Sequence, residues 1–264
     1  MDKLLACEGF LLDMDGTLNL GDAPLPGARE FLQTLQRLGK KFVYLTNNSS
    51  RSSKDYVNRM RGMGFPCEKE NVFTSGEATA LYLRENYPDR PVFPVGTAAF
   101  CRELTGFGIE TAYREDSPVV VGFDRELNYE KLEKATHLLR RGAPFIAANP
   151  DRVCPMPGDE ALPDCGSICA LLSSATGREP LYIGKPDRRM IDLVSARLGI
   201  PNEKLCCVGD RLYTDVAAAE NAGAVSVLVL SGETTREMLE SAVQKPDYVF
   251  EDVGALASAL SARS

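Results

Sequence analysis

The stretch Gly9-Phe10-Leu11-Leu12-Asp13-Met14-Asp15-Gly16-Thr17-Leu18 joins a short apolar run to two carboxylates one residue apart. The apolar run predicts a buried strand. Because side chains alternate along a strand, Asp13 and Asp15 share one side at its carboxyl end, where open α/β sheets bind ligands. Two carboxylates so close repel each other unless a cation lies between them or one carries a proton. The pair therefore predicts a Mg²⁺ site or a general acid beside a nucleophile, unless it is an ordinary strand-to-turn junction with solvated Asp residues.

The composition is that of a globular chain without the charge balance of a nucleic-acid binder. Charged residues make up 25% and hydrophobic residues 44% of the 264 residues, and 30 Lys and Arg against 37 Asp and Glu give a net charge of −7. A chain of this length is near the size at which one core divides, so we expect two domains. Because the overall field repels a phosphorylated substrate, its binding needs a local metal, a lysine or helix N-termini.

The cysteines and apolar segments favour a protein with reduced thiols and no membrane span. The spacing of the eight cysteines follows no compact disulfide framework, so we expect reduced thiols, a cytoplasmic location and no zinc site. The single histidine, His137, lies in a predicted helix without a partner motif, and we expect it not to be catalytic. No apolar run approaches the about 18 residues of a membrane helix. We expect no secretory signal, because cleavage after the N-terminal apolar segment would remove Asp13.

Strand-like and helix-like segments alternate along the chain. This rhythm predicts a Rossmann-like, doubly wound parallel sheet as an α/β core. Thr46 and Lys185 are much further apart than one crossover connection requires, so we expect an inserted α/β cap domain at 80–178 between the core segments 1–79 and 179–264. The strands expected in the core are 10–12, 41–46, 181–183, 204–208, 225–230 and 248–250, and those expected in the cap are 92–95, 119–123 and 144–148.

Four motifs in a fixed order resemble those of the haloacid dehalogenase superfamily of phosphatases. They are Asp13-Met-Asp15-Gly-Thr-Leu, Leu45-Thr46-Asn47-Asn48-Ser49, Gly184-Lys185-Pro186 and Gly209-Asp210-Arg-Leu-Tyr-Thr-Asp215. An insertion between the second and third motifs, with Ala148-Asn149-Pro150-Asp151 and Gly166-Ser167-Ile168, is similar to that of subfamily IIA, the NagD-like and 4-nitrophenylphosphatase-like proteins. Together with Ser231-Gly232-Glu233-Thr234-Thr235, the resemblance covers nearly the whole chain.

The resemblance implies a division of labour among the acidic residues. Asp13 would be the nucleophile that forms an aspartyl phosphate, and it would also bind Mg²⁺. Asp15 would protonate the leaving oxygen and then activate water, with its backbone carbonyl as a further metal ligand. Asp210 would bind the metal directly. Asp215 would hold a metal-bound water or orient Lys185, although it could simply cap a helix that begins near Val216.

The remaining predicted site residues would bind the substrate. Thr46, Asn47 and Asn48 would bind phosphoryl oxygens if they are more than a polar loop, and Lys185 would do so if it is not a surface lysine. In the cap, the resemblance implies substrate contacts from a loop and a helix start, although such polar residues are as often plain turn and cap residues. The cap residues are Asn149, Asp151, Gly166 and Ser167.

We therefore expect a Mg²⁺-dependent phosphatase of small phosphorylated metabolites. Candidates are phosphoglycolate, glycerol phosphate, sugar phosphates, nucleoside monophosphates and pyridoxal phosphate, with nitrophenyl phosphate as an artificial substrate. A phosphotransferase or mutase is disfavoured, because known mutases have their cap between the first two motifs. A pseudo-enzyme that binds a phosphometabolite is disfavoured by the intact Asp13, Asp15, Lys185 and Asp210. Related enzymes often pair through the cap, so a homodimer is one expected assembly.

Overall fold

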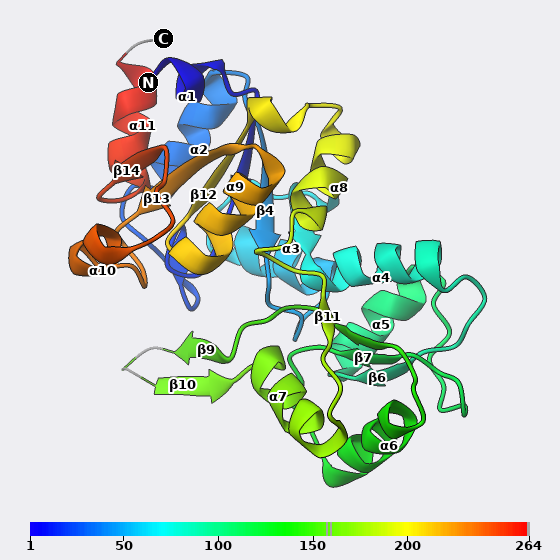
Figure 1. Cartoon of the computed structure of the whole chain (residues 1–264). Helices are drawn as coiled ribbons and strands as arrows, with labels where there is room; N and C mark the ends of the chain where they lie inside the picture. Colours follow the sequence, from blue (N-terminus) through cyan, green and yellow to red (C-terminus); the bar gives the residue numbers. More distant parts are fainter. Residues whose placement is uncertain (157, 159, 263–264) are drawn as a thin grey trace. The chain divides into compact units, whose positions relative to one another are not determined.

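The computed structural model describes residues 1–156, 158 and 160–262, and the chain divides into two compact units (Figure 1). The core unit comprises Met1–Thr46, Tyr56–Phe73 and the chain from Lys185 on. The inserted unit comprises Asn47–Asp55 and Thr74–Gly184. Among the described residues, no helix is both long enough and apolar enough to cross a membrane.

The core unit is built on a six-stranded sheet in the order β14-β13-β12-β1-β4-β5. The pairings from β14 through to β4 are parallel. The chain adds strands on one side of β1 and later on the other, so β1 lies at the point where the strand order reverses. This confirms the predicted doubly wound α/β sheet. Its strands are β1 (Gly9–Leu12), β4 (Lys41–Thr46), β5 (Val72–Thr74), β12 (Leu205–Gly209), β13 (Val225–Val229) and β14 (Tyr248–Phe250).

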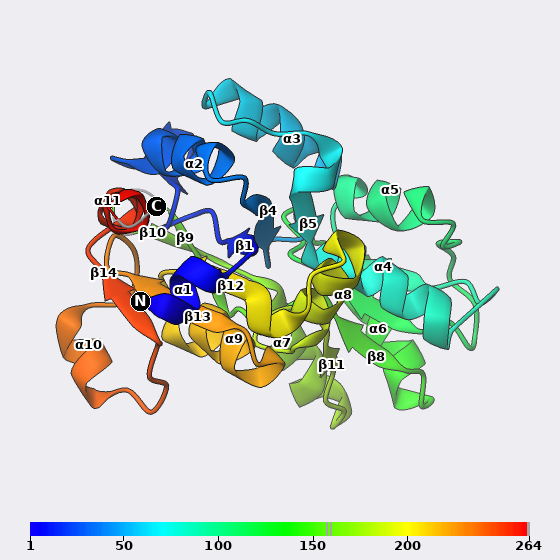
Figure 2. The same ribbon diagram turned by 90° about the horizontal axis from the view of Figure 1, so that it is seen from above.

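Helices cover both faces of the core sheet (Figure 2). One face carries α2 (Ala28–Arg37), α11 (Val253–Ser261) and α3 (Ser53–Gly62), and the other carries α8 (Arg189–Leu198) and α9 (Ala217–Ala222). Apolar residues at helical spacing, such as Phe31 and Leu35, form the buried side of α2. The close approach of α2 and α11 depends on Gly27, because a Cβ there would lie 2.5 Å from the Cα of Gly254. Two shorter helices are α1 (Asp2–Ala6) and α10 (Arg236–Ser241).

The inserted unit contains its own four-stranded parallel sheet, in the order β11-β8-β7-β6. Helices α4 (Ser75–Asn86) and α5 (Ala98–Gly106) lie on one face, and α6 (Tyr129–Arg140) and α7 (Cys165–Thr176) lie on the other (Figure 1). Strand β9 (Val153–Met156) pairs antiparallel with β10 (Glu160–Pro163). The sheet strands are β6 (Phe93–Val95), β7 (Val119–Val121), β8 (Phe145–Ala147) and β11 (Leu181–Tyr182).

The structure corrects the expected strand at 181–183 and shifts the unit boundaries. Leu181 and Tyr182 form the edge of the inserted sheet, paired with β8, and not a strand of the core sheet. A short apolar segment does not indicate which of two parallel sheets it joins, because both bury such residues alike. The boundary expected between 79 and 80 falls inside α4, and the division lies between Phe73 and Thr74. The sequence pattern also does not predict β5.

Candidate active site

Predicted site residues follow three neighbouring strands of the core sheet. Asp13 follows β1, Asp210 follows β12, and Thr46 is the last residue of β4. The backbone N–H of Asp13 still donates to the carbonyl of Val208 over 2.9 Å, so Asp13 remains in register with β12. The carboxyl ends of parallel strands meet at one edge of the sheet, which brings residues distant in sequence together.

Three carboxylates converge at this edge. Asp13, Asp210 and Asp215 each offer an oxygen, and these oxygens lie within 4.8 Å of one another. Asp215 comes from the turn of π-helix at Leu212–Val216, and its Oδ2 accepts from the N–H of Arg211 at 3.2 Å. The side chain of Asp215 therefore does not cap the helix that follows.

Lys185 is buried among these carboxylates, with 4% of its side chain exposed. Its Nζ donates to Asp13 Oδ1 and to Asp215 Oδ1, both over 2.6 Å, and to the carbonyl of Leu45 over 3.3 Å. Lys185 is therefore not a surface lysine. Its contact with Asp215 is the one that orientation of Lys185 would use, and the role of Asp215 stays a prediction.

The negative charges of the cluster exceed what Lys185 compensates, as the pKa values of the acids show. Burial, Asp215 and Asp210 raise the pKa of Asp13 to about 8, against the opposing effect of Lys185. Burial and Asp215 also raise the pKa of Asp210 to about 6. Burial would lower the pKa of Lys185, but the Asp13 and Asp215 carboxylates outweigh it and raise that pKa. Both acids therefore resist ionisation, and a bound divalent cation would stabilise their ionised forms. The ligand atoms offered here are all oxygens, which is the ligand type that Mg²⁺ prefers.

Hydrogen bonds from Thr17 and Glu233 hold the Asp210 carboxylate in place. Thr17 Oγ1 donates to Asp210 Oδ1 over 3.1 Å, and the N–H of Glu233 donates to Oδ2 over 2.8 Å. A Cβ on Gly232 would lie 2.0 Å from Oδ2, and one on Gly16, whose φ is +95°, would lie 2.4 Å from it. We did not predict these supporting roles. The residues belong to quoted motifs, but a motif does not say what its members contact.

The Asp15 carboxylate has hydrogen-bond partners of its own, Asn19 and Arg59. Its Oδ1 accepts from Asn19 Nδ2 at 2.7 Å and from Arg59 Nη2 at 3.1 Å, and its Oδ2 accepts from Arg59 Nη1 at 3.3 Å. Its side chain is 40% exposed, against 16% for Asp13. The two carboxylates therefore differ in exposure and in hydrogen-bond partners, and their catalytic roles stay predictions. The sequence pattern gave no signal for Arg59.

The second motif divides between the two units. Thr46 is buried at the end of β4 in the core unit, whereas Asn47 and Asn48 belong to the inserted unit. The carbonyl of Asn47 accepts from Ser75 Oγ and from Asn149 Nδ2, each at 2.6 Å. Asn48 Oδ1 accepts from the N–H and the hydroxyl of the serine two positions on, at 3.0 and 2.7 Å. The loop is thus tied by its own polar groups.

The four predicted cap residues meet at one junction of a loop with α7. Asn149 Oδ1 accepts from the N–H of Asp151 at 3.1 Å, and the N–H of Gly166 donates to the Asp151 carbonyl over 2.8 Å. A Cβ on Gly166 would lie 2.2 Å from a backbone oxygen of this loop. The hydroxyl of Ser167 donates to the carbonyl of the residue after Asp151. These contacts build the loop, and substrate contact stays a prediction.

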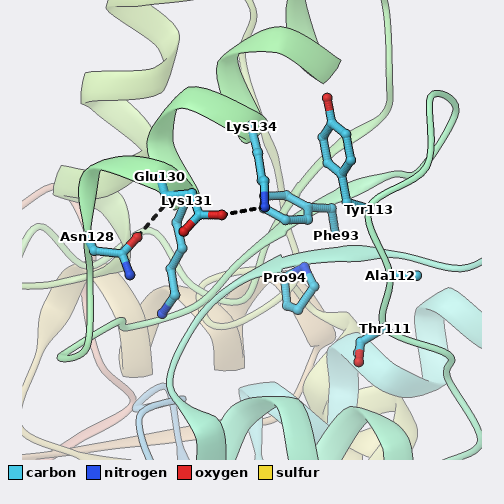
Figure 3. Close-up of a pocket in the computed structure, with 9 residues that line it drawn as sticks. All are labelled: Phe93, Pro94, Thr111, Ala112, Tyr113, Asn128, Glu130, Lys131 and Lys134. Atoms are coloured by element: carbon cyan, nitrogen blue, oxygen red, sulfur yellow. Dashed lines mark hydrogen bonds and ion pairs between the residues drawn. The ribbon is translucent and has the colours of Figure 1, made fainter.

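A cavity of about 380 Å³ in the inserted unit contains none of the predicted site residues (Figure 3). Its lysines already have partners. Lys134 pairs with Glu130 at 2.6 Å and lies 5.6 Å from the centre of the Tyr113 ring, and Lys131 pairs with Asp124 at 2.7 Å. We therefore assign the chemistry to the carboxylate cluster and not to this cavity.

Comparison with known proteins agrees with the geometry. Residues 10–110 match a family model described as haloacid dehalogenase-like hydrolase, and residues 182–256 match a HAD-hydrolase-like model. The chain is 35% identical to the chloroplastic phosphoglycolate phosphatase 1A of Arabidopsis thaliana, over 94% of this chain and 76% of that protein. This chain belongs to the haloacid dehalogenase-like hydrolase family.

Solved structures identify the branch of the family. A 4-nitrophenylphosphatase from Thermotoga maritima is 46% identical to this hydrolase, with a TM-score of 0.92, over 98% of this chain and 99% of that one. NagD from E. coli K-12 is 32% identical, with a TM-score of 0.87, over 94% of this chain and 97% of that one. The predicted NagD-like phosphatase, a phosphoric monoester hydrolase, is thereby confirmed.

Proposed function

We propose that this haloacid dehalogenase-like hydrolase is a Mg²⁺-dependent phosphatase of small phosphorylated metabolites that carries the phosphoryl group on Asp13. The observation that carries the proposal is the convergence of Asp13, Asp210 and Asp215 around the buried Lys185. Hydrolysis of a phosphate monoester needs an in-line nucleophile, neutralisation of the phosphoryl oxygens and a proton for the leaving alkoxide. The chain has a group suited to each need.

The metal would be held by carboxylate and carbonyl oxygens. Asp13, Asp210 and the backbone carbonyl of Asp15 would be its protein ligands, with Asp215 beside them. When bound, Mg²⁺ supplies positive charge to the phosphoryl oxygens and between the carboxylates. Thr17 and Glu233 would keep Asp210 aimed at the ion, through the hydrogen bonds already described.

In the first chemical step, a carboxylate oxygen of Asp13 attacks phosphorus as the bond to the leaving oxygen breaks. Asp15 gives its proton to that oxygen, and the alcohol leaves. In the second step, Asp15 takes a proton from water, and the resulting hydroxide attacks phosphorus. This releases inorganic phosphate and restores Asp13. Lys185 fixes the Asp13 carboxylate through Oδ1 and places a positive charge beside the phosphoryl group.

The substrate would be recognised in two parts. Thr46, Asn47, Asn48 and Lys185 would meet the phosphoryl group common to all substrates, and the cap would meet the leaving group. The relatives are named for phosphoglycolate and for 4-nitrophenyl phosphate, which share only a small phosphate ester. We therefore propose small phosphorylated metabolites as the substrate class. The loop residues at issue are Asn149, Asp151, Gly166 and Ser167. The cytoplasmic location and the homodimer stay predictions.

Metal removal and replacement test the proposal. The protein is stripped with chelator and assayed against a panel of phosphorylated metabolites, with and without added Mg²⁺. We expect turnover to disappear and to return with Mg²⁺, while Ca²⁺ inhibits because its larger shell lets Asp13 bind through both oxygens. Asp13→Asn should be inactive throughout, and Asp192→Asn, on the surface helix α8, should match the wild type. Full activity in excess chelator would contradict the metal assignment.

A further inference from the structure

Arg59 in α3 donates four hydrogen bonds to acceptors around Asp15. Its Nη1 and Nη2 donate to the two Asp15 oxygens, over 3.3 and 3.1 Å. Its Nε donates to Asp22 Oδ1 over 2.9 Å, and Nη2 also donates to the Gly21 carbonyl. The Arg59 side chain is only 11% exposed, so the guanidinium lies within the fold and does not extend freely into solvent.

The partners of Arg59 belong to one short hairpin that follows the Asp pair. Strands β2 (Asn19–Leu20) and β3 (Ala23–Pro24) pair antiparallel, with Gly21 and Asp22 between them. Asn19 Nδ2 donates both to Asp15 Oδ1 and to the Gly21 carbonyl, over 2.7 and 2.9 Å. Arg59, which lies in α3, therefore links the Asp15 carboxylate to this turn.

The fork geometry of these contacts fixes the direction of the carboxylate. A half-exposed aspartate held only by Asn19 would retain freedom about its side-chain torsions. A planar guanidinium that contacts both oxygens removes that freedom, which a lysine ammonium cannot do in the same way. Asp13 needs no such partner, since Lys185 already holds it.

We propose that Arg59 is a positioning residue that holds Asp15 in the orientation from which it protonates the leaving oxygen and later accepts a proton from water. The proposal rests on the role of Asp15 in the proposed function. In this proposal Arg59 acts through Asp15 and not on the substrate directly. Its loss should therefore matter only where Asp15 transfers a proton.

Two substrates with different leaving groups separate this role from a general structural one. Glycerol phosphate releases a strongly basic alkoxide, which needs the proton, whereas nitrophenyl phosphate releases a weakly basic phenolate, which needs little. In Arg59→Met with Mg²⁺, we expect glycerol phosphate to phosphorylate the enzyme about 10- to 100-fold more slowly, as misplacement of an acid by about 1 Å can produce. Nitrophenyl phosphate should phosphorylate it at nearly the wild-type rate.

The second half of the reaction gives an independent signal. Hydrolysis of the phosphoenzyme also needs Asp15, so Arg59→Met should release a burst of nitrophenolate and then turn over slowly, with phosphorylated enzyme accumulating. Rapid quench and mass spectrometry measure both. In an Asp15→Asn background, Arg59→Met should cause less than about a twofold further loss, because its effect passes through Asp15.

Matched variants control for folding and for the hairpin. Arg61→Met, in the same helix with a half-exposed side chain paired to Glu68, should leave both steps unchanged. Asp22→Asn weakens the tie to the turn while both Asp15 contacts of Arg59 remain, and it should have a smaller effect than Arg59→Met. If circular dichroism shows that Arg59→Met does not fold, Arg59→Lys replaces it. This variant keeps the charge and loses the fork, and we expect the same pattern with a smaller loss.

Three results would overturn the inference. They are equal losses in the rate at which the two substrates phosphorylate the enzyme, faster turnover with glycerol phosphate in the variant, and a full further loss in the Asp15→Asn background. If Asp15→Asn alone kept wild-type rates, the proposed function would fail instead. The outcome for Asp15→Asn thus distinguishes the two failures.

Discussion

Replacement of Lys185 by Met removes the ammonium group that hydrogen-bonds to both Asp13 and Asp215. Lys185 holds Asp13 and Asp215 at 2.6 Å each, and both carboxylates lose that partner in the variant. Removing one partner of a buried ion pair typically costs about 3 to 5 kcal/mol, because the remaining charge stays buried without compensation. Because Asp13 is only partly ionised at pH 8, we expect Lys185→Met to lower the free energy of unfolding of the metal-free protein there by up to about that amount.

The pH dependence of this loss has a defined sign. The pKa of Asp13 is about 8 with Lys185 present, and loss of the lysine raises it further. A carboxyl group whose folded pKa exceeds its unfolded value stabilises the fold at low pH, and this contribution is lost as the pH rises toward the folded pKa. The difference between variant and wild type should therefore be smaller near pH 5 than above pH 8, because the contribution of Asp13 to it disappears at low pH. Mg²⁺ stabilises the folded form of each protein, by about 2.7 kcal/mol at 100 times its Kd, so it reduces the difference only to the extent that it binds the variant more tightly.

Urea unfolding followed by circular dichroism at pH 5 and pH 8, with chelator or Mg²⁺, measures these differences. Lys204→Met is the matched control, because Lys204 pairs with Glu8 on the surface and its loss should change stability by less than about 1 kcal/mol. The reasoning would be refuted if Lys185→Met unfolded like the wild type at pH 8 without metal, or if its deficit were larger at pH 5.

Three further predictions follow from other contacts. Gly232→Ala should displace Asp210 and raise the Mg²⁺ concentration for half-maximal activity about 10- to 100-fold, and an unchanged Mg²⁺ titration would contradict this. Glu103 accepts from the backbone and side chain of Ser53 and from Thr74, and burial raises its pKa, so the wild type should lose stability relative to Glu103→Gln as the pH rises from about 4.3 to neutrality. Parallel plots of Tm against pH for the two proteins would argue against that. Alanine at 149–152 should change the ranking of natural substrates while nitrophenyl phosphate hydrolysis persists, and an equal loss for all substrates would show that the cap only excludes water.

The site residues that follow strands could be predicted from the sequence. Asp13 and Asp210 each follow a short apolar run, and parallel strands bring such positions to one edge whatever their separation in sequence. The order of the motifs then identified Lys185, which is buried and donates hydrogen bonds to Asp13 and Asp215.

Contacts between the surface of a helix and a loop could not be predicted from the sequence. Helical periodicity in α3 predicts that Tyr56, Val57 and Met60 face inward, and they are buried. It does not indicate that Arg59, on the same helix, reaches Asp15, because a charged residue at such a position usually faces solvent. Assignment of Leu181 and Tyr182 failed for a related reason, since the pairing of a short strand depends on the sheet that lies beside it.

The site of phosphorylation tests the central claim most directly. Asp15→Asn is mixed with nitrophenyl phosphate and Mg²⁺, quenched in acid, digested and analysed by mass spectrometry. The good leaving group lets the first step proceed while hydrolysis of the phosphoenzyme is slowed by about 10² to 10⁴. We predict one phosphoryl group per chain, located on Asp13. A phosphoryl group on any other residue, or wild-type turnover by Asp13→Asn, would contradict the mechanism.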